Sequence, residues 1–269
     1  MKTWGVIGCG WLGLPFATKL INDNCKAYGT TTTESKLDKL VEVGVSPVLL
    51  NKEQPQINQP WINSCDYILL NIPPTSFKEN YALAMKQLVD NVNAQAKVIF
   101  ISSTSVYKNK SQIAKEEDHL DGTSRNAPYI VEAERVLYEK LNGNLTVIRM
   151  AGLVGGDRNP AKFMAGKEYD GGQEPVNLIH LEDCIGLIDK VVEEKYWGEI
   201  LNGCATKHPM KSSYYMSVSK QLGITSPKFN DNMVKHKIVS NNKSRNELGY
   251  EYKYDSPFEF PLDVLKKQN

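Results

Sequence analysis

Apolar and polar positions alternate along the chain in a way that predicts short strands separated by segments of helical length. The six clearest β-rich runs cover Thr3–Ile7, Lys26–Thr30, Pro47–Leu50, Asp66–Asn71, Lys97–Ser102 and Asn144–Arg149. Residues 67–70 and 98–101 are continuously apolar, as parallel strands are when helices cover both faces of their sheet. Successive strand, helix and strand units join through right-handed crossovers. The pattern therefore predicts an α/β fold with a doubly wound parallel sheet.

The pattern loosens after Arg149, where glycines interrupt the sequence at positions 152, 155, 156, 166, 171 and 172. Later segments predict helices over Leu181–Glu193, Met210–Leu222 and Asp263–Lys267, with a short polar turn at Asn241–Arg245. We therefore expect residues 1–150 to form the sheet domain. Residues 151–269 should form a small C-terminal α+β substrate lobe, with segments that return to the sheet and make one compact unit.

Composition excludes several classes of protein. The chain has 269 residues, 41% of them hydrophobic and 23% charged, which suits an ordinary globular core. Its net charge is +1, so we expect no nucleic-acid partner, because that binding relies on clustered Lys and Arg. No apolar run approaches the ~20 residues that span a bilayer, and the N-terminus lacks a signal-peptide pattern. We expect a monomer or homodimer without a membrane partner.

The cysteines and histidines indicate neither disulfides nor a metal site. Five cysteines are scattered along the chain without a C-x-x-C pair, at Cys9, Cys25, Cys65, Cys184 and Cys204. This spacing is typical of reduced, buried thiols, and it predicts a cytoplasmic protein. The four histidines show no paired His/Glu or Cys/His spacing, so we expect no bound metal.

A glycine-rich loop, residues 8–13, follows the first predicted strand and precedes a segment of helical pattern. Its sequence, Gly-Cys-Gly-Trp-Leu-Gly, has the G-x-G-x-x-G spacing that binds dinucleotides when a strand and a helix flank it. The first glycine turns the chain, the second lets a pyrophosphate approach the backbone, and the third packs the helix on the strand. We therefore expect a nicotinamide dinucleotide to contact Gly8, Gly10, Trp11, Leu12 and Gly13. The alternative is a tight strand-to-helix turn without a ligand.

The end of the second predicted strand bears on the choice between NAD and NADP. An acidic residue ~20 positions after the glycines usually accepts the ribose hydroxyls of NAD. Here Thr31 and Thr32 occupy that region and Lys36 follows, so no carboxylate repels a 2′-phosphate and a cation can neutralise one. We expect NADP as the cofactor, with NAD as the alternative. In the competing interpretation the threonines cap a helix and Lys36 is merely solvated.

Two further loops follow predicted strands, at the ends where open α/β sheets bind ligands. Asn71, Ile72 and Pro73 should line the cofactor groove with their backbone, although a rigid turn without function explains them equally well. Residues 102–107, Ser-Ser-Thr-Ser-Val-Tyr, place several hydroxyl groups after the fifth predicted strand, and Tyr129 begins a predicted helix.

These motifs together resemble those of the short-chain dehydrogenase/reductase superfamily, in its extended branch of NAD-dependent epimerases and dehydratases. The resemblance rests on the glycine loop, residues 102–107, Tyr129, residues 149–158 (Arg-Met-Ala-Gly-Leu-Val-Gly-Gly-Asp-Arg) and residues 177–183 (Asn-Leu-Ile-His-Leu-Glu-Asp). It covers most of the chain and implies a Rossmann-type sheet with a nicotinamide cofactor. Extended members usually carry glycine at the position of Ile7, so this spacing points to atypical members.

The resemblance also implies roles for single residues. The family's serine that matches Ser103 binds the substrate oxygen, and the tyrosine that matches Tyr129 exchanges a proton. A lysine normally lies four residues after this tyrosine, but here the position is Ala133, so the charge that helps the phenol ionise is missing. A packing role is the alternative for Tyr129. Residues that could face an anionic substrate, or instead be structural, are Arg149, Arg158 and His180.

The sequence leaves three functions open. The first is an NAD(P)-dependent oxidoreductase or epimerase that acts on a hydroxyl or carbonyl group of a small molecule, with a sugar as the class the resemblance implies. The second is a non-catalytic dinucleotide-binding sensor or scaffold, which Ala133 favours. The third is a β-hydroxyacid dehydrogenase, which shares the glycine spacing but whose all-helical second domain does not suit the glycine-rich residues 152–172. Because only about 120 residues follow Arg149, we also expect the substrate lobe to fit a bulky nucleotide sugar poorly.

Overall fold

The computed structural model describes residues 1–230 and 232–262, and the chain divides into two compact units. The first unit consists of Met1–Val106, Leu120–Arg149 and Val191–Leu201. The second consists of Tyr107–His119, Met150–Lys190 and Asn202–Asn269. Each unit is therefore assembled from separate stretches of sequence. The helix expected at Asp263–Lys267 lies outside the described residues.

A seven-stranded parallel sheet is the framework of the first unit, with the strand order β11-β7-β5-β4-β1-β2-β3. Its strands are β1 (Thr3–Ile7), β2 (Lys26–Thr31), β3 (Ser46–Leu49), β4 (Tyr67–Leu70), β5 (Lys97–Ser103), β7 (Leu145–Met150) and β11 (Ile200–Gly203). β1 pairs in parallel with β2 and β4, β2 with β3, and β4 with β5. The chain order reverses between β1 and β4, at the kind of switch point where such sheets bind ligands. The predicted fold class is confirmed.

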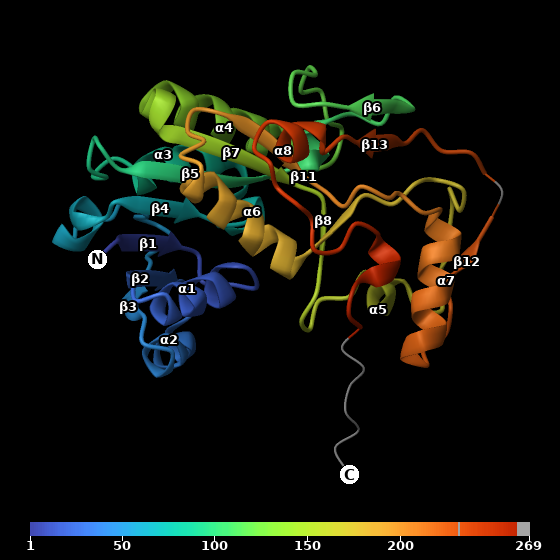
Figure 1. Ribbon diagram of the computed structural model, residues 1–269, viewed down its shortest axis with the longest axis horizontal. Helices are drawn as coiled ribbons and strands as arrows, with labels where there is room; N and C mark the ends of the chain where they lie inside the picture. Colours follow the sequence, from blue (N-terminus) through green and yellow to red (C-terminus); the bar gives the residue numbers. More distant parts are fainter. Residues whose placement is uncertain (231, 263–269) are drawn as a thin grey trace, which may run out of the picture. The chain divides into compact units, whose positions relative to one another are not determined.

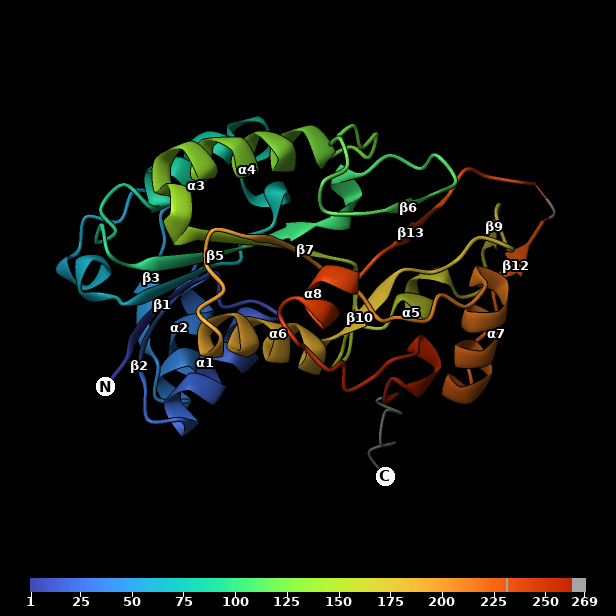
Figure 2. The same cartoon turned by 45° about the horizontal axis from the view of Figure 1, so that its top comes forward.

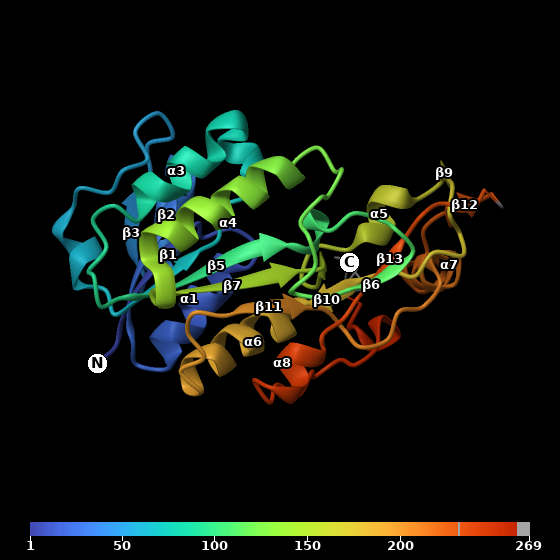
Figure 3. The same cartoon turned by 90° about the horizontal axis from the view of Figure 1, so that it is seen from above.

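Helices cover both faces of this sheet, which explains its apolar strands. They are α1 (Gly13–Asn22), α2 (Leu37–Glu42), α3 (Tyr81–Leu88) and α4 (Ala127–Leu141). α3 and α4 lie side by side on one face, and α1 and α2 lie on the other (Figures 1 and 2). Seen from above, α3 and α4 extend across the strands (Figure 3). The apolar run of β4 is accordingly buried from both sides, with no exposure at Ile68, Leu69 or Leu70.

Short strands and helices make up the second unit. Its two-stranded parallel ladders pair β8 with β10, β9 with β12 and β6 with β13. The elements are β6 (Gln112–Ala114), β8 (Gly152–Val154), β9 (Glu168–Tyr169), β10 (Leu178–His180), β12 (Lys228–Phe229), β13 (Lys237–Val239), α5 (Pro160–Met164), α7 (Lys211–Leu222) and α8 (Asn242–Asn246). α7 packs Tyr214, Tyr215 and Val218 into a buried cluster with Val176 and Phe260.

Most of the elements predicted from the sequence have the expected bounds. β1 and α6 (Leu181–Glu193) match to the residue; β2, β5 and α7 differ by one residue at one end, and β3, β4 and β7 differ by one residue at each end. The polar turn expected at Asn241–Arg245 is wrong, because Asn242–Asn246 form helix α8. Two polar side chains here are buried and hydrogen-bonded, Ser244 within the helix and Asn241 at its N-cap: Ser244 Oγ donates to the Asn241 carbonyl at 2.9 Å, and Asn241 Nδ2 donates to the Cys204 carbonyl at 2.8 Å. A polar sequence here does not mean an exposed turn.

Single turns of 3-10 helix connect many of these elements. They are η1 (Glu34–Lys36), η2 (Pro60–Ser64), η3 (Pro74–Ser76), η4 (Lys78–Asn80), η5 (Thr104–Val106), η6 (Asn142–Asn144) and η7 (Pro257–Glu259). Among the described residues, no helix combines the length and apolar character needed to cross a membrane. Nor do they bring together three or more His, Cys, Asp or Glu side chains in a group that could hold a metal.

Candidate functional site

The three glycines of the glycine loop differ in what surrounds them. Gly8 has φ +104°, and a Cβ there would lie 2.5 Å from the Asn71 carbonyl oxygen. A Cβ at Gly13 would lie 2.1 Å from the Gly8 carbonyl oxygen, so only glycine lets α1 approach the loop this closely. A Cβ at Gly10 would meet no heavy atom of the described residues within 4 Å. The protein itself therefore does not require glycine at position 10, whereas a ligand that approaches the backbone there would.

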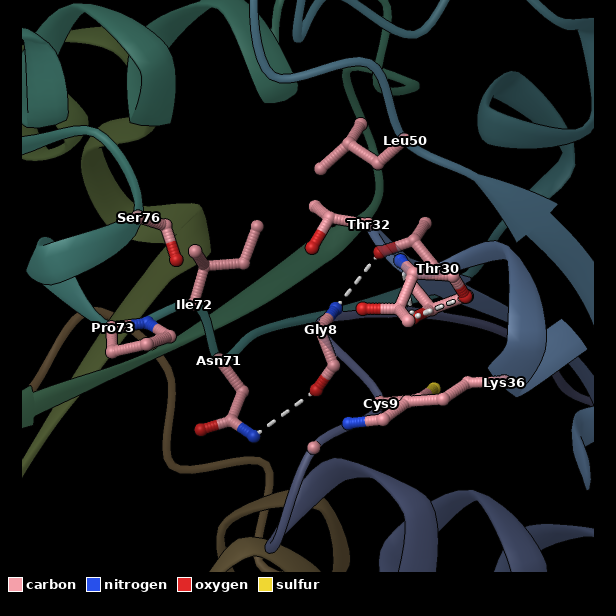
Figure 4. Close-up of a pocket in the computed structure, with 13 residues that line it drawn as sticks. Gly8, Cys9, Thr30, Thr32, Lys36, Leu50, Asn71, Ile72, Pro73 and Ser76 are labelled. Carbon is pink, nitrogen blue, oxygen red and sulfur yellow. Dashed lines mark hydrogen bonds between the residues drawn. The ribbon is translucent and has the colours of Figure 1, made fainter.

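Hydrogen bonds from two neighbouring strands hold this loop in place. At the end of β2, Thr30 Oγ1 accepts the N–H of Gly8 at 2.9 Å, and the Thr30 carbonyl accepts the N–H of Cys9 at 2.8 Å. Beyond β4, Asn71 Nδ2 donates to the Gly8 carbonyl at 3.3 Å, as Figure 4 shows. Burial raises the pKa of the Cys9 thiol to about 12, so at neutral pH the loop carries no thiolate charge. The loop is thus rigid and uncharged.

The start of α1, directly after the loop, carries no acidic side chain. The first backbone N–H groups of a helix lack intrahelical acceptors, and the helix dipole adds partial positive charge there. The first turn consists of Gly13, Leu14, Pro15 and Phe16, so none of its side chains is a carboxylate that would compete for these N–H groups. A phosphate is therefore favoured at this position.

An open groove lies above the loop, between the carboxyl ends of β1, β2 and β4. Of the residues predicted to bind the cofactor, it is lined by Gly8, Gly10, Thr31, Thr32, Lys36, Asn71, Ile72 and Pro73. Five further residues line the groove but were not predicted from the sequence, namely Cys9, Thr30, Thr33, Leu50 and Ser76. Cys9 and Thr30 adjoin predicted positions, and Leu50 and Ser76 follow strands whose ends reach the same side of the sheet. Trp11, Leu12 and Gly13 lie where α1 begins, and the Leu12 side chain is buried in the core.

The threonines after β2 differ in what their side chains do. Thr31 is 8% exposed and its Oγ1 accepts the N–H of Thr33 at 3.2 Å, so it shapes the turn. Thr32 and Lys36 are exposed at the groove. Thr33 occupies the N-cap position of η1, but its side chain makes no capping hydrogen bond. Thr32, Thr33 and Lys36 are therefore the exposed side chains in this segment that line the groove.

The opposite wall of the groove is fixed by a buried tyrosine. Tyr81, at the start of α3, is 1% exposed, and its hydroxyl donates to the Ile72 carbonyl at 2.8 Å. Burial raises the pKa of Tyr81, so its phenol keeps the proton that this hydrogen bond requires. The backbone of Ile72 and Pro73 is thereby held against the groove.

Ser103 and Tyr129 both belong to the first unit and are both partly accessible. Ser103 ends β5, and its Oγ accepts the N–H of Ser105 at 3.1 Å. Tyr129 lies in the first turn of α4, and its hydroxyl donates to Glu79 Oε1 at 3.3 Å. Ala133 has no exposure, so the position at which the related family carries lysine lies on the buried face of α4.

The three residues expected to face an anionic substrate lie in different surroundings. Arg149 is 2% exposed, and its Nε and Nη2 donate to the Glu134 carboxylate at 3.0 and 2.7 Å. His180 is 5% exposed and packs against the rings of Tyr254 and Phe260. An ion pair and an aromatic cluster thus bury these two side chains, which agrees with the structural roles that were the alternative for them. Arg158 is exposed, in the turn where it pairs with Gly155.

Comparison with known proteins supports a nicotinamide dinucleotide at the glycine loop. Residues 3–128 match the family model described as the NAD binding domain of 6-phosphogluconate dehydrogenase. UDP-glucuronic acid 4-epimerase from Bacillus cereus, solved in complex with NAD, superposes with a TM-score of 0.77 at 16% identity, over 95% of this chain and 94% of that one. MoeE5, solved with UDP-glucose and NAD, superposes with a TM-score of 0.75 at 14% identity, over 96% and 95%.

The matched family model covers the glycine loop and the strands around it, and not the rest of the chain. The described part of the second unit contains strands as well as helices, so the β-hydroxyacid dehydrogenase alternative, with its all-helical second domain, does not fit. The whole chain is instead matched by Protein YeeZ of Escherichia coli (strain K12), which is 32% identical over 274 residues, 98% of this chain and 100% of that protein. The chain therefore belongs to the family of Protein YeeZ, and its fold is that of the extended short-chain dehydrogenases/reductases.

Proposed function

We propose that this protein is an NAD(P)-dependent oxidoreductase or epimerase that acts on a hydroxyl or carbonyl group of a small molecule. The observation that carries the proposal is the empty space at Gly10, in a loop that is otherwise rigid and faces a helix start. The match of residues 3–128 to an NAD binding domain supports it, as does the similarity to NAD-bound epimerases. When bound, the nicotinamide supplies the hydride chemistry.

Different residues of the groove bind different parts of the dinucleotide. The backbone at Gly10 and the start of α1 binds the pyrophosphate. Thr32 and Lys36 lie at the adenosine end and favour the 2′-phosphate of NADP, because the hydroxyl can donate to it and the ammonium neutralises it. Asn71, Ile72 and Pro73 form the wall that the Tyr81 hydrogen bond holds in place.

Ser103 and Tyr129 are the proposed catalytic pair. Ser103 orients the substrate oxygen and Tyr129 gives or takes its proton, as the family resemblance implies. Both hydroxyls now hydrogen-bond within the protein, to Ser105 and Glu79, so substrate would replace or extend these contacts. Arg158, which is exposed, is the remaining candidate contact for an anionic substrate.

A sugar is the proposed substrate class, and size does not exclude a nucleotide sugar. The expectation of a lobe too small for one rested on the short stretch of chain that follows Arg149, part of which returns to the sheet. This chain, however, covers 95% of MoeE5, a protein solved with UDP-glucose. The length of the chain therefore does not count against nucleotide sugars, and they belong among the substrates to be screened.

The cofactor assignment is tested by filling the space at Gly10. Gly10→Ala should weaken NADP(H) binding at least tenfold, about 1.4 kcal/mol, because its methyl group occupies the space a pyrophosphate needs. The matched control is Gly143→Ala, whose Cβ also meets no neighbour within 4 Å and which lies after α4, away from the loop. Affinities are measured by titration of NADPH fluorescence. Equal affinity in both variants and wild type would sink the assignment.

Catalysis is tested at Tyr129. Tyr129→Phe should lower turnover about a hundredfold or more while cofactor affinity stays unchanged, because it removes the proton-transferring hydroxyl alone. The control on the same helix is Tyr138→Phe, whose side chain is 52% exposed. With a panel of sugars, nucleotide sugars and simple carbonyl compounds, NADPH absorbance follows net oxidation or reduction, and NMR of the products detects epimerisation, which leaves the cofactor's redox state unchanged. Turnover that survives in Tyr129→Phe would make Tyr129 a packing residue.

A non-catalytic sensor is the second candidate, and one observation favours it. The position of the missing lysine is buried as Ala133, so this charge is absent from the phenol's own helix. The sensor would bind dinucleotide with the same dependence on Gly10 and turn over no compound of the panel. The two candidates therefore share the binding test and differ in the turnover test.

A further inference from the structure

A second hollow lies at the amino end of the sheet, far along the strands from the glycine loop. This amino-end cleft is lined by Cys65, Asp66, Tyr67, Asn93, Gln95, Ala96, Lys97, Lys195 and Trp197, all in the first unit. Tyr67 and Lys97 are the first residues of β4 and β5, whereas the glycine loop follows the last residue of β1. Because these strands are parallel, the two sites lie at opposite ends of the sheet. The N-terminus marks the amino end in Figure 1.

Positive charge prevails among the residues that line the cleft. Lys97 and Lys195 contribute two ammonium groups and Asp66 one carboxylate. Asp66 Oδ2 already accepts the N–H of Thr3 at 2.8 Å. Lys97 Nζ donates to Asn144 Oδ1 at 2.5 Å, and an amide oxygen fixes the ammonium without neutralising it. The cleft is therefore lined by the ammonium group of Lys97, which a hydrogen bond fixes, and by the ammonium group of Lys195.

Neighbouring groups add to this positive field. Lys2 lies over the Tyr67 ring, with Nζ 5.4 Å from its centroid, and Lys26, at the start of β2, is close enough to act electrostatically on Cys65. Burial raises the pKa of the Cys65 thiol to about 12, so it adds no negative charge at neutral pH. A concave site lined mainly by one sign of charge attracts the opposite sign.

Aromatic rings give the cleft a flat apolar wall. Tyr67 stacks on Trp4 with centroids 4.8 Å apart, and Trp197 lies against Tyr67 at 5.8 Å with a 30° tilt. Trp4, Tyr67 and Trp197 thus form a row of rings. Trp4, which is 3% exposed, is its buried end, and Tyr67 and Trp197 are half-buried and line the cleft. A planar ring can therefore join the row and keep the offset or tilted contacts that aromatic rings prefer.

The backbone at Lys195 allows its side chain to be removed without a loss of stability. Lys195 has φ +54°, a left-handed conformation that costs free energy for any residue except glycine. It lies where a helix ends, since the N–H of Tyr196 returns to the Val191 carbonyl at 2.9 Å. Glycine is the usual residue at this place, and it would relieve the strain. Here a lysine is held in a strained conformation at the cleft wall.

We propose that the amino-end cleft binds a small molecule in which a planar ring carries an anionic group, a phosphate or a carboxylate. The ring packs beside Tyr67 and Trp197, and the anion lies between the ammonium groups of Lys97 and Lys195. The side-chain amide of Gln95 supplies a further hydrogen bond. The site is separate from the dinucleotide groove and does not depend on the proposed function.

Phenyl phosphate is the simplest probe, because it joins a ring to a phosphate. Its binding to the full-length protein is followed by NMR, from the Trp197 indole N–H and the Gln95 amide. Inorganic phosphate lacks the ring and phenol lacks the charge, so each should bind at least tenfold more weakly. Benzoate, with a carboxylate in place of the phosphate, decides which of the two anions the cleft prefers. Binding that is not saturable, or shifts confined to Gly8 and Gly10, would overturn the proposal.

Lys195→Gly separates ligand binding from folding, because it removes the ammonium and relieves the strained backbone. The variant should be at least as resistant to unfolding as wild type, yet bind phenyl phosphate at least tenfold more weakly. Lys78→Gly is the matched control: Lys78 also has a positive φ, +51°, and lies before α3, outside the cleft lining. Its binding should stay within twofold of wild type. Unchanged binding in Lys195→Gly, or equal losses in the two variants, would refute the site.

Discussion

At the scale of single residues, burial decides between structural and functional roles that sequence motifs leave open. Arg149 begins a family motif and was a reasonable substrate contact, but it pairs with Glu134 in the core. Ser102 Oγ joins the same carboxylate at 2.5 Å. Glu134 itself had no motif to identify it, because its role depends on β5 and β7 meeting α4 in space. At Gly10, by contrast, the structure agrees with the motif: the motif expects a ligand close to the backbone, and the space beside Gly10 is unfilled.

The Glu134–Arg149 pair makes a prediction about stability. Arg149→Met should lower the free energy of unfolding by about 3–5 kcal/mol, because it leaves the Glu134 carboxylate buried without its partner. The double variant Glu134→Leu/Arg149→Met should recover most of this loss, since it removes both charges. Urea unfolding followed by circular dichroism measures both.

The neighbouring Arg135 is the control for this pair. It bonds to Glu132 and Glu139 on the surface of α4, where its side chain is 54% exposed. Arg135→Met should leave the free energy of unfolding unchanged within error, because exposed ion pairs contribute little. If Arg149→Met proved as mild as Arg135→Met, the buried pair would not hold α4 to the sheet.

At the scale of elements, the sequence predicts those whose pattern is long or continuous. Residues 67–70 are apolar throughout and form β4, and the amphipathic period of Leu181–Glu193 defines α6 to the residue. The short strands of the second unit, such as β9 and β12 with two residues each, are too brief to show a period. Their pairing comes from tertiary contact, which no local pattern encodes.

The same limit applies to the candidate groove. The glycine loop was identifiable because its motif, strand and helix are contiguous in the sequence. Leu50 and Ser76 reach the groove from the ends of other segments, and nothing in their local sequence marks them as lining residues. Parallel strand ends converge on one side of the sheet, so the missing residues could be sought there, but only once the strand order is known.

At the scale of the whole molecule, charge balance restricts how the cofactor is selected. The chain has 32 basic and 31 acidic residues, a net charge of +1, and so little overall field to attract a more negative ligand. NADP carries one phosphate more than NAD. Any preference for it must therefore arise from charges within reach of that phosphate, and Lys36 is the lysine that lines the groove.

Lys36→Ala should accordingly reduce the ratio of NADP affinity to NAD affinity about five- to tenfold. The variant should mainly weaken the binding of NADP, because it loses a charge-assisted hydrogen bond to the 2′-phosphate. The preference of wild type should shrink as salt rises, since Lys36 is exposed and the screening length falls from ~10 Å at 0.1 M to ~3 Å at 1 M. The control is Lys39→Ala, which makes the same change in net charge from an exposed position on α2.

The dissociation constants of NADP and NAD are measured at low and high salt for wild type, Lys36→Ala and Lys39→Ala. Equal losses in the two variants would mean that the overall charge selects NADP, and a preference for NAD that persists in Lys36→Ala would show that this segment does not recognise the 2′-phosphate.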